Sequence, residues 1–170
     1  MERLELAIPT LFGLEGLCAD EMRRLGLPEV RAENGRVLCG GTEADLPRLN
    51  LNLRTGERVL LVLGSFPADN FDALFEGTKA LPWERFIPRE GQFPVKGHCL
   101  NSALHAVPAC QAIVKKAVAA RLGEKYGLNT LPETGALYQI QFSIMKDTAT
   151  LMLDTSGDVY KRQCQSLPPR

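Results

Sequence analysis

The stretch VPACQAIVKKAVAARLGEK, residues 107–125, decides how the second half of this chain folds. At 100° per residue, its larger apolar side chains gather on one half of a helical wheel. Pro108 suits the first turn of a helix, where its missing N–H would have no partner in any case. These features predict a long helix with a buried face made of Cys110, Ile113, Val114, Ala117, Val118 and Leu122.

The opposite half of this helix carries two adjacent lysines, Lys115 and Lys116. Their neighbours on that half are small or uncharged: Gln111, Ala112 and Ala119. A solvated helix face usually mixes charges, because Glu–Lys pairs one turn apart stabilise the helix. We find no carboxylate placed to pair with these lysines, so we expect them to be open to an anionic partner. The alternative is a solvated face that happens to be basic.

The segments around this helix predict a unit of mixed helices and strands. A helix is expected over 69–81, a strand over 92–100 and a hairpin over 138–154 that turns at Lys146-Asp147. Pro94 makes the strand an edge strand or an irregular one, because proline cannot donate a ladder hydrogen bond.

The first half of the chain predicts the order strand, helix, strand, strand, helix, strand. Strands are expected over 3–10 and 57–66, with a hairpin over 29–41 around Asn34-Gly35, a preferred tight turn. A helix begins near Leu14 and stops at Gly26, and a shorter one over 43–55 takes Thr42 as its N-cap. This order is the split βαβ pattern of ferredoxin-like domains. The expected core of this unit contains Leu14, Leu17, Met22, Val37, Leu60 and Val62.

The predicted fold class is therefore α+β, with two units. We place the first over residues 1–67 and the second over 68–157, with the Phe66–Asn70 segment FPADN linking them. Residues 158–170 look foreign to the fold, as a truncated or misassembled reading frame would.

Charge is informative once it is divided along the chain. The whole chain has 20 basic and 20 acidic residues, and this balance predicts neither a nucleic acid partner nor a cation partner. The window 96–125 nevertheless contains five basic residues and one acidic residue. Lys96 and His98 on the strand, Asn101 and Ser102 in the loop, and the free N–H groups at the helix start are expected to form one anion-binding surface.

Other site classes find little support in the sequence. Five cysteines form an odd set without a CxxC pair, which favours reduced thiols over a disulfide framework or a zinc site. The sequence has no P-loop, GxGxxG or GxSxG motif, so we expect no active site. No run approaches the ~20 apolar residues of a membrane span, and the N-terminus is not a signal peptide. We expect a soluble, cytoplasmic protein without a membrane partner.

Seven segments, taken together and in order, resemble a known family: PTLFGLEGLCADEMRRLG, ENGRVLCGG, NLNLRTGERVLLVLGSF, FDALFEGTKALPWERFIP, FPVKGHCLNSAL, VPACQAIVKKAV and DTSG. The chain is similar to the N-terminal part of THUMP-domain class I S-adenosylmethionine-dependent RNA methyltransferases, of the type that modifies guanine N2 of 23S ribosomal RNA. The resemblance covers about residues 4–157.

This resemblance implies a ferredoxin-like domain, then a THUMP domain that binds RNA, then a Rossmann-like catalytic domain that is absent here. S-adenosylmethionine would belong to that missing domain, and no cofactor is expected in this chain. Ala106 and Ala109 depart from the family, which often has serine and an acidic residue there. Ala106 removes a helix cap, and Ala109 removes an acidic charge. The loss of that acidic charge favours phosphate binding at the helix start.

The leading hypothesis is therefore a non-catalytic RNA-binding fragment whose partners are structured RNA, ribosomal in kind, and the missing methyltransferase domain. Its RNA-binding residues would be Lys96, His98, Asn101, Ser102, Lys115 and Lys116. Arg54 and Arg58 are a second possibility, although a structural role at a helix end and a strand start fits them better. One alternative is a THUMP module of another RNA-modifying enzyme, of the tRNA thiolation or deamination type. Another is a purely structural protein whose basic patch has no partner.

Overall fold

The computed structural model describes residues 3–33, 35–56 and 58–155. The chain divides into two compact units, one formed by Met1–Val62 with Asp154–Arg170 and the other by Leu63–Leu153. Each unit has its own helices, and β4, which begins in the first unit and ends in the second, pairs with strands of both. Each unit is described by itself below.

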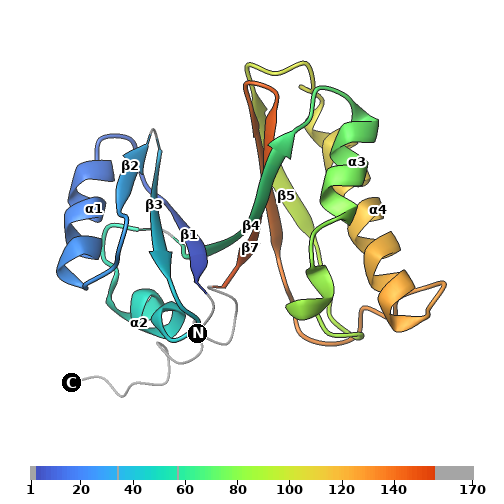
Figure 1. Ribbon diagram of the computed structural model, residues 1–170, viewed down its shortest axis with the longest axis horizontal. Coiled ribbons are helices and arrows are strands. Elements are labelled where there is room, and N and C mark those ends of the chain that lie inside the picture. Colours follow the sequence, from blue (N-terminus) through green and yellow to red (C-terminus); the bar gives the residue numbers. More distant parts are fainter. Residues whose placement is uncertain (1–2, 34, 57, 156–170) are drawn as a thin grey trace. The chain divides into compact units, whose positions relative to one another are not determined.

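The first unit has the element order that the sequence predicts (Figure 1). Its sheet runs β2-β3-β1-β4, with β1 antiparallel to both β3 and β4. This is the strand order of a ferredoxin-like fold, so that prediction is confirmed. The elements are β1 (Leu4–Pro9), α1 (Glu15–Arg24), β2 (Arg31–Glu33), β3 (Arg36–Gly41), α2 (Asp45–Asn52) and the start of β4 (Leu60–Pro67).

Two details of the first unit differ from expectation. Of the expected core residues, Leu14 and Val62 are only half-buried, and Leu17 is 59% exposed because α1 turns Cys18, Ala19 and Met22 toward the core. Thr42 does not cap α2 with its side chain; its N–H and hydroxyl donate to the Asp45 carboxylate instead, at 2.9 and 3.0 Å. The expected turn residue Asn34 lies outside the described residues, and Gly35 beside it has the positive φ, 77°, that such turns require.

The second unit has a sheet in the order β4-β7-β6-β5, with α3 and α4 on one of its faces (Figure 1). Strands β5 and β6 are parallel and are joined through α4, whereas β6 and β7 form an antiparallel hairpin. Both of its turn residues, Lys146 and Asp147, have positive φ, of 50° and 59°. The elements are α3 (Phe71–Lys79), the 3-10 turn η1 (Trp83–Arg85), β5 (Val95–Leu100), α4 (Val107–Tyr126), β6 (Ile140–Met145) and β7 (Thr148–Asp154).

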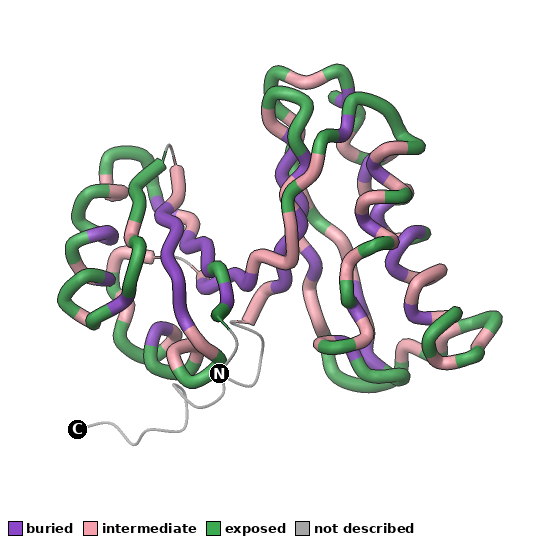
Figure 2. Tube along the Cα trace, in the orientation of Figure 1, coloured by how far each residue is buried: buried purple, intermediate pink, exposed green. Residues whose placement is uncertain are grey.

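Helix α4 begins at Val107, as predicted, and ends at Tyr126, one residue later than predicted; Ile113, expected on its buried face, is half-buried. Pro108 lies in its first turn, and Gly127 ends it in the left-handed conformation that glycine adopts readily. Its buried residues are Cys110, Val114, Ala117, Val118 and Leu122. The core that they join lies between the helices and the sheet, where Figure 2 shows buried positions on both layers.

Hydrogen bonds fix the ends of the helices in this second unit. The Trp83 indole N–H donates to the Thr78 carbonyl at 2.7 Å, and the Tyr126 hydroxyl donates to the Ile87 carbonyl at 2.7 Å. Within the described ranges no helix is long and apolar enough to cross a membrane.

Candidate nucleic-acid interface

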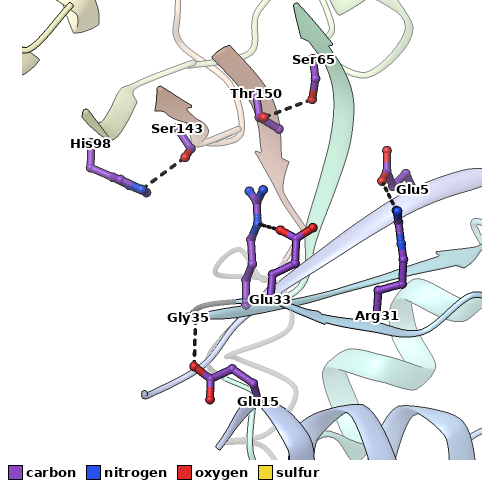
Figure 3. Close-up of polar contacts among 10 residues, drawn as sticks. Glu5, Glu15, Arg31, Glu33, Gly35, Ser65, His98, Ser143 and Thr150 are labelled. Atoms are coloured by element: carbon purple, nitrogen blue, oxygen red, sulfur yellow. Dashed lines mark hydrogen bonds and ion pairs between the residues drawn. The ribbon is translucent and has the colours of Figure 1, made fainter. Parts of the chain in front are cut away.

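Lys96 and His98 lie on the face of the second unit's strands that none of the described helices of this unit covers. Exposure alternates along β5, with Lys96, His98 and Leu100 exposed and the residues between them half-buried. The Sγ atom of Cys99 lies 3.8 Å from that of Cys110 on α4, so Cys99 faces the helices. Because side chains alternate along a strand, Lys96 and His98 point away from α4. Figure 3 shows the His98 ring beside Ser143, with Nε2 3.2 Å from the hydroxyl oxygen.

The loop after β5 is fixed against the β6–β7 turn. The Ser102 hydroxyl donates to the Leu100 carbonyl at 3.1 Å and accepts the Asp147 N–H at 2.9 Å. The Asp147 carboxylate accepts the Ala103 N–H at 2.8 Å. Ser102 thus shapes the loop, while Asn101 is exposed beside it with a φ of 51°.

Lys115 is not the unpaired surface lysine that the sequence predicts. Its ammonium group pairs with the Glu133 carboxylate at 2.5 Å and donates to the Phe93 carbonyl at 3.1 Å. It also lies 3.8 Å from the centre of the Phe93 ring, a cation–π contact. The expectation that no carboxylate pairs with this lysine is wrong, because the loop before β6 brings one back to α4. The contact lowers the pKa of Glu133, chiefly through the hydrogen bond from Lys115.

Lys116 is exposed, as the sequence predicts, and borders a wide, open depression of about 660 Å³. The lining comes from the outer side of α4 and the segment that follows it: Ala119, Ala120, Gly123, Glu124, Gly127, Leu128 and Asn129. The Glu124 carboxylate in this lining is paired with Lys79 at 2.7 Å.

The other basic side chains of α4 also have acidic partners. Arg121 binds the Glu84 carboxylate through two N–H groups, at 2.9 and 2.7 Å, and Lys125 lies 4.0 Å from the same carboxylate. Of the five basic residues in the window 96–125, therefore, only Lys96 and Lys116 have no carboxylate partner among the described residues.

The first N–H groups of α4 have no capping side chain. Ala106 precedes the helix without a side-chain cap, and its first turn contains no acidic residue. His105, just before it, is exposed and has Nδ1 3.1 Å from the Ala103 carbonyl.

Arg54 and Arg58 both make contacts within the first unit, and the structural role favoured for them above stays a prediction. The backbone N–H of Arg54 donates to Glu21 at 2.9 Å, and the Arg58 guanidinium pairs with Asp154 at 2.7 Å.

The six expected RNA-binding residues therefore do not form one surface. Lys96 and His98 lie on the open sheet face, Asn101 and Ser102 in the loop at its edge, and Lys115 and Lys116 on the helix layer across the sheet. Sequence reasoning also missed Ser65, Gln141, Ser143 and Thr150, which the strand register places on the same face as Lys96 and His98. Alternation in residues 138–152 is a signal that could have found Gln141, Ser143 and Thr150.

The Glu15 carboxylate joins the loop between β1 and α1 to the β2–β3 turn, accepting the Gly13 N–H at 2.8 Å and the Gly35 N–H at 2.9 Å. The described ranges hold no group of three His, Cys, Asp or Glu side chains arranged to hold a metal ion.

Two family models match the chain in the same order as its two units. The RlmL ferredoxin-like domain matches residues 5–60, and the THUMP domain matches residues 68–154. The chain belongs to the THUMP domain family.

Its relatives include larger methyltransferases. It is 42% identical over 159 residues to the "Putative RNA methyltransferase YpsC" of Bacillus subtilis, covering 92% of this chain and 41% of that protein. It is 31% identical to the ribosomal RNA large subunit methyltransferase K/L of Pseudomonas entomophila, covering 92% and 22% respectively.

A solved structure from Listeria monocytogenes, titled a predicted N6-adenine-specific DNA methylase, matches with a TM-score of 0.87 at 43% identity. It covers 100% of this chain and 46% of that one. The chain thus spans less than half the length of these relatives.

Proposed function

We propose that this chain is the RNA-binding part of an S-adenosylmethionine-dependent RNA methyltransferase of the cytoplasm, with structured ribosomal RNA as its partner. Its THUMP match and its relatives named as RNA methyltransferases support the class. The chemistry would be carried out by a domain outside the described residues. The proposed target of the whole protein is guanine N2 of 23S ribosomal RNA.

The observation that carries this proposal is that two lysines, Lys96 and Lys116, have no carboxylate partner among the described residues of a chain with equal numbers of acidic and basic residues. Phosphate contacts from lysine give sequence-independent affinity. Exposed His98 and Asn101 lie near Lys96 in the chain and can donate to phosphate or sugar oxygens. In this proposal Ser102 and Lys115 act by holding the loop and α4 in place.

A binding titration tests the proposal. Fluorescence anisotropy of a labelled 23S rRNA hairpin should show saturable binding that weakens steeply between low and physiological salt. A DNA hairpin of the same sequence is the matched probe, since the Listeria relative carries a DNA methylase title. Tighter binding to DNA, or no binding to either, would contradict RNA as the partner.

The target is tested separately, with the complete protein. Mass spectrometry of nucleosides from 23S rRNA should show loss of an N2-methylguanosine when the gene is deleted, and its return on complementation. Loss of a thiolated or deaminated nucleoside instead would favour a THUMP module of another modifying enzyme.

A further inference from the structure

The strands of the second unit have one face that none of the described helices of this unit covers. Cys99, Phe142 and Leu151 point to the helix side, where Phe142 and Leu151 are buried. Alternate residues of the same strands point to the other side, and several are exposed there, including Lys96, His98 and Ser65. Among the described residues of the second unit, no further layer covers this face, so its polar side chains can form a contact surface.

A polar row crosses all four strands of this open face. His98 on β5 is the register partner of Ser143 on β6, which in turn is the partner of Thr150 on β7. The Thr150 hydroxyl lies 3.1 Å from the hydroxyl of Ser65 on β4 (Figure 3). Strands are about 4.8 Å apart, so the row spans roughly 14 Å. The row thus consists of three hydroxyls and an imidazole, with hydrogen bonds between His98 and Ser143 and between Thr150 and Ser65.

The residues around this row add positive charge and no negative charge. On one side of the row, Lys96, Gln141 and Met152 are register partners, and on the other side Leu100, Met145 and Thr148 are. None of these ten side chains is a carboxylate. The helix side differs, because Glu84, Glu124 and Glu133 all lie on or against α4.

We infer that the sugar–phosphate backbone of a structured RNA lies across this open face, with the polar row as its hydrogen-bonding track. This inference rests on the proposed function and selects the sheet side over the Lys116 side. Hydroxyls and an imidazole can donate to phosphate oxygens, and hydroxyls can also accept from the 2′-hydroxyl, which distinguishes RNA from DNA. Lys96 contributes the charge contact. Ser143, 3% exposed, is a positioning residue that orients the His98 ring.

The test compares the two sides of the sheet with matched variants. The double variant Ser65→Ala/Thr150→Val removes two hydroxyls from half-buried or exposed positions, so folding should survive; circular dichroism and thermal unfolding check this. Binding of the RNA hairpin should weaken by about tenfold, since two hydrogen bonds are lost. Binding of the DNA hairpin should change by less than about twofold, because DNA has no 2′-hydroxyl for these two side chains to contact.

Lys96→Ala and Lys116→Ala form the second comparison. We expect Lys96→Ala to weaken RNA binding severalfold and Lys116→Ala to change it little. A larger loss from Lys116→Ala than from the sheet-face variants would overturn this inference while leaving RNA binding intact. Equal losses on RNA and DNA would overturn the 2′-hydroxyl track. If the unmodified chain binds no RNA, it is the proposed function that fails.

Discussion

Lys115 on α4 and Glu133 in the loop before β6 form an ion pair across 18 residues of sequence, and the same ammonium group lies over the ring of Phe93. One side chain thus joins the middle of α4 to the segment that leads into β5 and to the loop that leads into β6. The adjacent Lys116 makes no such contact with a carboxylate of the described residues. Two neighbouring lysines therefore have different roles, one structural and one open to solvent.

The first prediction concerns stability. Lys115→Ala should lower the free energy of unfolding by about 1–2 kcal/mol, through loss of a half-exposed ion pair and a cation–π contact. Lys116→Ala should change it by less than about 0.5 kcal/mol, as exposed helix positions usually do. Urea denaturation at pH 7 measures both, and equal effects of the two substitutions would contradict the structural role of Lys115.

The same ion pair sets a pH dependence. Lys115 lowers the pKa of Glu133 in the folded chain, so this contribution to stability is present above the ordinary carboxyl pKa of about 4.3 and is lost as pH falls through the folded value. The stability difference between the unmodified chain and Lys115→Ala should therefore shrink between about pH 5 and pH 3. A difference that stays constant over this range would show that packing against Phe93, and not the charge pair, carries the effect.

Another prediction concerns the loop between β1 and α1. Hydrogen bonds from Gly35 and Gly13 lower the pKa of Glu15, whose carboxylate joins this loop to the β2–β3 turn. Glu15→Gln should speed hydrogen exchange at both glycine amides, because a neutral amide oxygen accepts more weakly than a carboxylate. The amide of Thr10 donates to the Gly35 carbonyl at 2.9 Å, so its exchange rate shows whether the opening spreads to the end of β1. Unchanged exchange at all three amides would mean that the loop is held by other contacts.

Much of this fold could be predicted from sequence because its signals are local. Pro108 and Gly127 mark the ends of α4, and Lys146-Asp147 marks a hairpin turn. The partner of Lys115 could not be predicted in this way, because Glu133 reaches it only through a loop whose path depends on tertiary packing. The separation of Lys96 from Lys116 was missed for a related reason. Alternation shows that Lys96 and Cys99 face opposite sides, but only the position of α4 shows which side is open.

A further prediction uses the cysteines as probes of packing. Burial raises the pKa of Cys39 to about 12, and burial with the neighbouring Cys99 thiol raises that of Cys110 to about 12 as well. Both should stay protonated at pH 8 and resist iodoacetamide, since the thiolate is the reactive form. Cys99, which is partly exposed, should be alkylated before Cys110. Peptide mass spectrometry after timed labelling distinguishes them, with the chain unfolded in guanidinium as the control in which all thiols react. Fast labelling of Cys110 in the folded chain would contradict the packing of β5 against α4.

The last prediction tests which lysines an RNA meets. Each phosphate contact made by lysine releases roughly one counterion, so losing one should reduce the slope of log affinity against log salt by about one unit. Lys96→Ala should show that reduction. Glu133→Gln frees the Lys115 ammonium without adding a positive residue. If RNA lies on the open sheet face, this change should leave the slope as it was.

The double variant Arg23→Ala/Arg24→Ala, on α1 of the first unit, is the matched control for diffuse charge and should leave the slope nearly unchanged. If Glu133→Gln instead steepens the slope by about one unit, the helix side makes the phosphate contacts. Lys115 would then bind RNA whenever its carboxylate partner is removed. That result would support the sequence-based expectation that Lys115 and Lys116 contact RNA.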